Sequence, residues 1–349
     1  MYTNIPAPLP DEYLRGYGFR ICAINSMPLN SLNKLLPNLL EITGLSIEQL
    51  IHHHTHLGYL RFASGNFFKN DISMHSDLLT NKRIYTSVCP VESYQFCPRC
   101  AEEDLDIYGV SLWRRAHLLP GVDHCSKHSV SLVIAEQMRT ISRQPAYAEV
   151  DQAAIPEDKS EDYFSSPFVH RFSVLSNLAM QTRVPLSPRV ITWVLVSKSN
   201  EVLGNERSVL TEFAFENAPF FWLAKHFRLI FKRANAATYS ALDDVLRSSQ
   251  TACSVKFYLL AMSLLWEDPH EAFNACLQEA SAHTGEFHES GAELALNEVL
   301  MGESIYKSCS RYGVHLREFE IEFRKFLEDI GPMAQSYAKK IKASSNNRR

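Results

Sequence analysis

The sequence predicts a mostly α-helical protein with a small metal-binding module between two helical parts. Apolar residues recur at three- and four-residue spacing in both halves of the 349-residue chain. Two short pairs of metal-binding side chains lie between them, and a polar, proline-containing stretch follows. We therefore expect an amino-terminal helical, helix-turn-helix-like domain (1–90), a zinc-knuckle module (91–135), a linker (136–166) and a helical carboxyl-terminal domain (167–345).

The amino-terminal part should contain several short helices. Pro8-Leu9-Pro10 stops a preceding element, and Asp11 can cap a helix whose apolar residues begin at Leu14. A second helix is expected over residues 31–42, and Ser46-Ile47-Glu48-Gln49 is a capping-box pattern that opens a third. This arrangement fits a helix-turn-helix domain, and it fits any small α-helical domain equally.

A histidine tract follows at His52, His53, His54 and His56. His52 and His56 are four residues apart and would share a helix face, as metal ligands do. No carboxylate of the zinc-protease pattern accompanies them, so we expect solvated side chains at a helix end. Residues 57–90 show no clean period, and their fold is not assigned.

The strongest pattern is Cys97-x2-Cys100-x24-Cys125-x2-His128. Each pair is a short knuckle that aims two side chains at one point, and together the pairs supply the four ligands of a tetrahedral zinc centre. Four protein ligands leave no position for a catalytic water, so the centre should be structural, with one Zn2+ per chain. His117 and His124 are competing donors, ranked lower because only His128 completes a two-residue-spaced pair.

Between the knuckles, residues 101–108 should form a helix that is acidic at its start and ends at Gly109. Residues 110–119 should be extended, with a turn at Pro120-Gly121. Trp113 is then expected to be buried against the knuckles as a structural residue. Because extended strands alternate faces, either Arg114 or Arg115 should point outward.

Composition narrows the function classes. The net charge is −4, so the whole molecule is not a basic nucleic-acid binder, and DNA contact would need a local patch. Five of the eight cysteines lie outside the metal pattern and are scattered, which fits a reducing cytoplasm better than a disulfide framework. The most apolar run, 252–266, contains Lys256 and is too short to span a bilayer. We expect a cytoplasmic protein without a signal peptide.

The knuckles carry a family resemblance. Cys97-Pro98-Arg99-Cys100, then the run from Trp113 to Val122, then Cys125-Ser126-Lys127-His128 resemble the TniQ family, which includes TnsD. The likeness covers about residues 6–135 and includes the Pro8–Glu12 opening. Many members have a second cysteine cluster, but residues 129–150 contain no cysteine, so we expect a single centre.

The resemblance implies a non-enzymatic target-selection protein of a Tn7-like transposon. Such proteins recruit the transposition proteins, an ATPase regulator and a transposase, to a chosen site. They reach that site by binding DNA or by docking on an RNA-guided CRISPR Cascade complex. A homodimer is an open alternative, and no membrane partner is expected.

Beyond the linker almost every segment has a helical pattern. Ser187-Pro188 caps one helix, and Pro219 opens another that carries Lys225, Arg228 and Lys232 on one face. This basic face is typical of any solvated amphipathic helix, and it is also compatible with a nucleic-acid or partner surface.

Residues 303–341 resemble the second helix-turn-helix of AraC-type regulators, whose longer helix enters the major groove of DNA. Here that helix offers Arg317 near its start, with Arg324 and Lys325 further along, as candidate DNA contacts. Its exposed face is otherwise acidic (Glu318, Glu320, Glu322), which repels phosphate. A hairpin that packs only on its own domain is an equal alternative.

Three function classes therefore compete. A TniQ-type adaptor fits best, and a sequence-specific transcriptional regulator that joins a TniQ-like module to an AraC-like reader is the alternative. The sequence has no Gly-rich phosphate loop, Gly-x-Ser-x-Gly elbow or open metal site, so we expect no enzyme and no catalytic residues.

Overall fold

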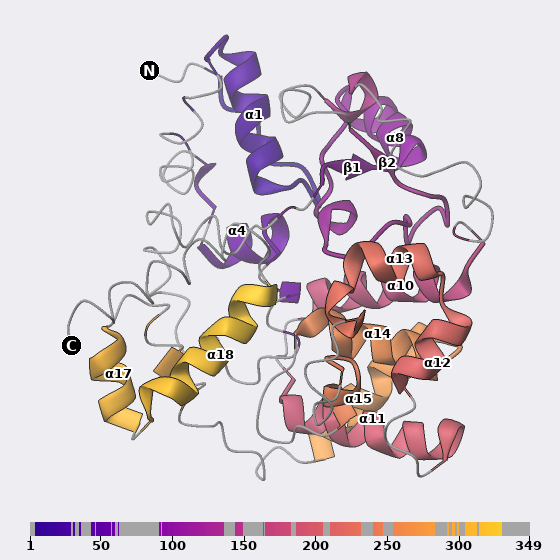
Figure 1. The fold of residues 1–349 in the computed structure, drawn as a ribbon. Coiled ribbons are helices and arrows are strands. Elements are labelled where there is room, and N and C mark those ends of the chain that lie inside the picture. Colours follow the sequence, from indigo (N-terminus) through magenta and orange to yellow (C-terminus); the bar gives the residue numbers. More distant parts are fainter. Residues whose placement is uncertain are drawn as a thin grey trace.

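The computed structural model of the chain (Figure 1) is mostly helical and has one short sheet within its described part. The structure describes residues 4–28, 31, 35, 43–45, 47–56, 58–59, 62, 91, 93–135, 144–148, 163, 165–182, 186–204, 210–231, 240–246, 254–282, 292, 295–296, 299, 304–312 and 314–329. Most of the expected second helix, nearly all of 57–90 and the tail from 330 lie outside the described residues.

The amino-terminal part of the chain contains α1 (Leu14–Ile24) and α4 (Ile47–His54). Helix α1 buries Leu14, as its apolar spacing predicts, but the cap prediction at Asp11 is wrong. Tyr13 is the N-cap residue, and Asp11 has a left-handed φ of 59° and pairs with Arg115 instead. The proline-rich opening ends in a turn, so the carboxylate points at a distant arginine rather than at the helix start.

The module that contains the four predicted ligands is built on β1 (Gln95–Phe96), α8 (Pro98–Tyr108), the 3-10 helix η4 (Arg115–Leu118) and β2 (Val133–Ile134). The strands pair antiparallel with Phe96 opposite Val133, so the two ends of the module are tied together. Helix α8 ends at Gly109, whose φ of 70° is left-handed, as predicted. The helix starts at Pro98 rather than at 101, so the acidic residues lie past its first turn.

The carboxyl-terminal part of the chain, called the helical domain below, is helical where it is described. Helix α14 (Val255–Leu265) lies at its centre, because α10 (Pro167–Gln181), α11 (Pro188–Leu203), α12 (Leu210–Asn217) and α15 (Pro269–Ala282) all contact it. All its residues except Lys256 are buried, which explains the apolar run seen in the sequence. Across the described residues, no helix has the length and hydropathy needed to cross a membrane.

Several short elements complete the described fold. They are η6 (Pro145–Tyr147), α13 (Phe220–His226), η8 (Arg228–Phe231) and η9 (Asp243–Leu246). The helix expected after Pro219 is therefore shorter than the pattern suggests, because α13 stops at Phe227 and a separate 3-10 turn follows.

The last described elements are α17 (Ile305–Tyr312) and α18 (Leu316–Asp329), which contact each other. A short turn joins them, closed by the Val314 amide donating to the Cys309 carbonyl at 2.9 Å. Phe319 and Phe323 are buried. Glu322 is also buried, at 5 % exposure, so its expected place on the exposed face is wrong. It stands one residue before Phe323 and three after Phe319, which places it on the packed side of α18.

Candidate metal centre

The first knuckle is shaped by the start of α8. Cys97 is the N-cap residue, Pro98 occupies the first helical position, and Cys100 lies in the first turn. The Ala101 amide donates to the Cys97 carbonyl at 3.0 Å, which fixes the turn. A helix amino terminus carries partial positive charge, and both sulfur atoms lie beside it.

The second knuckle is a loop rather than a helix. The Cys125 amide donates to the Val130 carbonyl at 2.8 Å, and the Ser129 amide donates back to the Cys125 carbonyl at 2.9 Å. Ser129 has a left-handed φ of 51°, which turns the chain sharply after His128. The chain then reaches β2, whose pairing with β1 returns it to the first knuckle.

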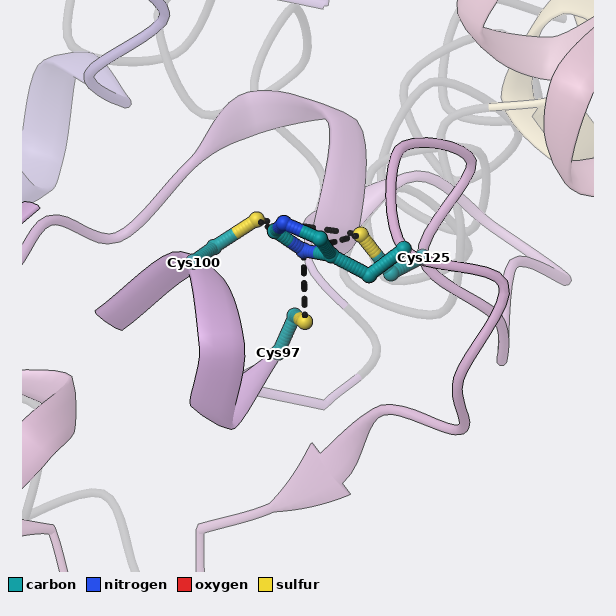
Figure 2. Close-up of side chains that lie close together, drawn as sticks. Cys97, Cys100 and Cys125 are labelled. Carbon is teal, nitrogen blue, oxygen red and sulfur yellow. Dashed lines mark hydrogen bonds between the residues drawn. The ribbon is translucent and has the colours of Figure 1, made fainter. Parts of the chain in front are cut away.

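The four predicted ligands come together. The Cys100 sulfur lies 3.7 Å from the Cys125 sulfur and 3.3 Å from the His128 Nδ1 atom. All four ligand atoms lie within 4.8 Å of one another, and Figure 2 shows the three cysteine side chains converging on one point. A tetrahedron with zinc bonds of about 2.3 Å to sulfur and about 2.0 Å to nitrogen has edges of about 3.5–3.8 Å. The group can therefore hold a metal ion of that size.

The pKa values of two of the cysteines are compatible with a bound cation. Hydrogen bonding from the Cys100 and Cys97 thiols lowers the pKa of Cys125, and the reciprocal contacts raise the pKa of Cys100. Protein groups alone thus stabilise one thiolate and oppose a second beside it. A bound divalent cation removes this opposition, because thiolates are the form that binds metal.

His128 is oriented by a carboxylate. Its Nδ1 atom faces the thiols, and its Nε2 atom lies 2.9 Å from the Glu103 Oε1 atom. Burial acts to lower the pKa of His128, but the hydrogen bonds to Glu103 and the thiols outweigh it and raise the pKa. Glu103 also pairs with Lys127, and these two partners lower the pKa of its carboxyl group. A carboxylate on the far nitrogen is the usual second partner of a metal-bound histidine.

The competing donors, His117 and His124, lie outside the ligand group. His117 is buried in η4, and burial lowers its pKa to about 4. The Nε2 atom of His124 lies 3.4 Å from the Ser131 hydroxyl, and burial lowers its pKa as well. Neither histidine belongs to the ligand group.

Trp113 is buried, with 3 % exposure, between the knuckles and the amino-terminal domain. Its ring meets those of Tyr94 and Phe96 edge-on at 5.4 Å and 6.0 Å. Its backbone carbonyl accepts from the Tyr13 amide at 2.7 Å. Gly16 lies against the ring so closely that an added Cβ would be 3.0 Å from the Trp113 Cβ atom.

The expectation that Arg114 or Arg115 faces outward is wrong. Arg114 forms an ion pair with Asp104 at 2.5 Å, which binds α8 to the segment that follows. Arg115 is buried at 6 % exposure, and its guanidinium donates to Asp11 and to the His52 carbonyl. The strand alternation fails because η4 begins at Arg115, so the two side chains do not follow an extended pattern.

The histidine tract is structural in part. His54 and His56 are buried, at 5 % and 0 % exposure, so the expectation of solvated side chains is wrong for both. The His54 Nδ1 atom donates to the Glu12 carbonyl at 2.8 Å, and His56 donates to the Arg115 carbonyl at 3.2 Å. Burial lowers the pKa of His54 to about 4. His53 is exposed and His52 is half-buried.

Residues 4–132 match the family model of TniQ. This part of the chain is therefore similar to TniQ, and it is called the TniQ domain below. No curated protein matches the chain. TniQ domains are associated with Tn7-like transposition. The matched region contains the amino-terminal helices, all four ligands and Trp113, and it ends one residue before β2.

The TniQ domain packs on the helical domain through its second knuckle. The Trp222 indole in α13 donates to the Gly121 carbonyl at 3.0 Å. Gly121 has a φ of 80°, and an added Cβ would meet the Phe172 ring at 2.9 Å, so only glycine fits at this contact. Asn177 in α10 donates to the Ser126 hydroxyl at 3.3 Å. The sequence predicted the Pro120-Gly121 turn but not its aromatic partners.

A buried carboxylate completes this contact. Asp123 lies two residues before Cys125 and accepts from the His226 Nε2 atom at 2.6 Å, from Lys225 at 3.1 Å and from the Tyr163 hydroxyl. Burial acts to raise the pKa of Asp123, but these donors outweigh it and hold the pKa below its usual range. Lys225 was expected on a solvated or nucleic-acid face, and this ion pair corrects that expectation. Arg228 is exposed, and Lys232 lies outside the described residues.

The candidate DNA contacts lie apart from the metal centre. Arg317 and Arg324 are exposed on α18, beside the exposed Glu318 and Glu320. The backbone of Lys325 belongs to α18, but its side chain lies outside the described structure. Figure 1 shows α17 and α18 on the opposite side of the molecule from α8.

Proposed function

We propose that this protein is a non-enzymatic target-site selection adaptor of a Tn7-like transposition system. It recruits an ATPase regulator and a transposase to DNA or to an RNA-guided CRISPR Cascade complex in the cytoplasm. The observation that carries the proposal is the TniQ domain, whose four-ligand group leaves no ligand position for a reacting water. We also propose the division into domains at residues 90, 135 and 166.

The metal we propose is one structural zinc ion per chain, held by Cys97, Cys100, Cys125 and His128. When bound, zinc crosslinks the two knuckles and contributes folding free energy to the module. Glu103 holds the His128 imidazole with Nδ1 toward the sulfur atoms. The amino terminus of α8 fixes the positions of the two cysteines of the first knuckle.

Charge supports an adaptor over a protein that reads DNA alone. On α18 the exposed Arg317 and Arg324 are offset by Glu318 and Glu320, so the helix offers phosphate little net attraction. Lys225 is occupied by Asp123. With a net charge of −4, these features support protein partners as the main route to the target.

The second candidate is a sequence-specific transcriptional regulator. The observation that favours it is the consecutive pair α17 and α18, with exposed Arg317 near the start of the longer helix. In this reading Arg317 contacts a base edge, and Arg324 and Lys325 contact phosphates. A homodimer would present two such helices to two half-sites.

Titration of the purified, metal-loaded chain against random and enriched duplexes separates the two candidates. The adaptor should bind either duplex alone no more tightly than about 10⁻⁴–10⁻⁶ M at physiological salt. It should co-elute with the ATPase regulator of its own element on size-exclusion chromatography, which also reports a homodimer. Nanomolar, sequence-selective binding without a partner would replace the adaptor with the regulator.

Arg317→Ala then identifies the reading residue. If α18 reads DNA, this change costs about 1–3 kcal/mol of binding free energy at one base position. Glu320→Ala on the same helix is the matched control and should not lower DNA affinity. Equal affinities for wild type and Arg317→Ala would exclude base reading by this residue.

A further inference from the structure

Three phenylalanine rings form a cluster on the surface of the helical domain. Phe215 is on α12, Phe220 begins α13, and Phe231 ends η8. The Phe231 ring centroid lies 5.0 Å from that of Phe215 and 5.3 Å from that of Phe220. Their exposed fractions are 40 %, 64 % and 37 %, so the rings contact one another and solvent.

The cluster rests on a packed base. Between the exposed rings in the chain, Trp222, Phe227 and Ile230 are buried and face the core. Phe227 packs edge-on against Trp222 at 4.9 Å, so the turn from α13 into η8 is held by aromatic contacts. The exposed rings are therefore presented on a supported backbone, which lowers the entropy cost of binding a partner.

The exposed area is large for side chains without a role in the core. With about 200 Å2 for a phenylalanine side chain, the three rings expose about 300 Å2 together. Patches of this size on a monomer are often functional. A standard interface buries about 800 Å2 on each partner, so this cluster would be its apolar centre rather than its whole extent.

Charges of both signs border the rings. Glu212 and Glu216 are exposed on α12, three residues before and one residue after Phe215. Arg228 is exposed in η8, and residues three apart in a 3-10 helix eclipse each other, so it lies on the same side as Phe231. Bases of a single strand can stack on such rings, but the two glutamates would repel its phosphates. The border therefore favours a protein with opposite charges at matching places.

We propose that Phe215, Phe220 and Phe231 form a docking site for an amphipathic helix of a partner protein. Its apolar stripe lies on the rings, a basic side chain lies toward Glu212 and Glu216, and an acidic side chain lies toward Arg228. The site is outside the TniQ domain, and the proposal does not depend on a role in transposition.

Three synthetic helical peptides test this proposal. All three have the same apolar face and differ only in the charged side chains along its two edges. The first peptide has one acidic and one basic edge, the second has two basic edges, and the third has two acidic edges. In fluorescence-anisotropy titrations of the full metal-loaded chain, the mixed-edge peptide should bind about two- to fivefold more tightly than either uniform peptide. Phe220→Ala should weaken its binding about tenfold or more. Ile107→Ala removes another highly exposed apolar side chain, at 67 % exposure on α8, and should leave binding unchanged.

The charge-reversed variant Glu212→Lys/Glu216→Lys gives the decisive comparison. The border then becomes wholly basic, so the peptide with two acidic edges should become the tightest ligand. An unchanged ranking of the three peptides, or no peptide binding that depends on Phe220, would overturn the proposal. Two further results would overturn the proposal, provided that Phe220→Ala leaves peptide binding intact. In one, this variant no longer binds a single-stranded oligonucleotide that the wild type binds. In the other, it no longer self-associates in sedimentation equilibrium, whereas the wild type does.

Discussion

The two knuckles have the same two-residue spacing, but different parts of the molecule hold them in place. Cys97 and Cys100 are positioned by the start of α8, through a helix cap and a proline that are adjacent to them in the chain. Cys125 and His128 lie in a loop whose neighbours contact α10 and α13, about fifty to a hundred residues further on. The first knuckle is a local structure, whereas the second depends on long-range contacts.

The ion pairs around the knuckles differ in the same way. Glu103 and Lys127 close the outer edge of the centre, with side chains 37 % and 57 % exposed. Asp123 and His226 lie on the inner side, at 5 % and 7 % exposure. Solvent screens the Glu103–Lys127 pair, so losing it costs little. Losing one partner of the Asp123–His226 pair would leave an unpaired charge in the protein interior. The four-ligand group thus lies between a locally determined part of the TniQ domain and the contacts with the helical domain.

Replacing a ligand should have the largest effect. Cys125→Ser is expected to reduce the zinc content, measured by elemental analysis, from about one per chain to near zero. Structural zinc contributes about 10–16 kcal/mol in small metal-dependent modules, so the melting temperature should fall sharply. Cys97→Ser should lose metal equally. In either variant, backbone amides of residues 121–131 should lose more protection from hydrogen exchange than those of α8. Equal loss in both segments would contradict the inference that the first knuckle is held locally and the second by long-range contacts.

Trp113→Ala should destabilise the protein by about 3–5 kcal/mol, because it removes a large buried aromatic side chain. Denaturant unfolding followed by circular dichroism measures this change. Ile107→Ala, at a highly exposed position on the same module, should change stability by less than about 0.5 kcal/mol. Equal midpoints for wild type and Trp113→Ala would mean that the tryptophan does not support the module.

Asp123→Asn should cost about 3 kcal/mol, since Lys225 and His226 would lose the buried carboxylate that pairs with them. The same unfolding experiment measures this cost. Glu103→Gln is the matched change on the outer edge. It should weaken zinc affinity about tenfold and, through that loss alone, lower the unfolding midpoint less than Asp123→Asn does. If both variants were equally stable, the inner and outer ion pairs would not differ as the burial indicates.

Acidification should destabilise the protein through His54. Its pKa is lowered from 6.5 to about 4 in the folded state, so the unfolded chain binds the proton first as pH falls. The stability contributed by neutral His54 is fully present above pH 6.5 and is lost as the pH falls from 6.5 to 4. By pH 5 the free energy of unfolding should have decreased by about 2 kcal/mol. Unfolding at pH 7 and pH 5 should show a smaller pH dependence in His54→Gln than in wild type. The exposed neighbour provides the control: His53→Gln should keep the wild-type pH dependence.

Local patterns in the sequence determined much of the fold and the identity of the ligands. The spacing of Cys97, Cys100, Cys125 and His128 was enough to predict a group that the structure brings together. Ser187-Pro188 predicted the start of α11, where the Ser187 hydroxyl accepts from the Arg189 amide at 3.3 Å. Such features depend on residues a few positions apart, so the sequence contains all the information needed to recognise them.

Only the tertiary structure decided which polar side chains are buried. Arg115, His54 and Glu322 belong to residue types that usually face solvent, and no local period distinguishes them. Arg115 is buried because its partners are Asp11 and the His52 carbonyl, which lie 104 and 63 residues away along the chain. Lys225 is likewise paired with Asp123, 102 residues earlier. A polar group can be buried only when distant hydrogen-bond partners offset its lost hydration, and the sequence pattern around it does not contain those partners.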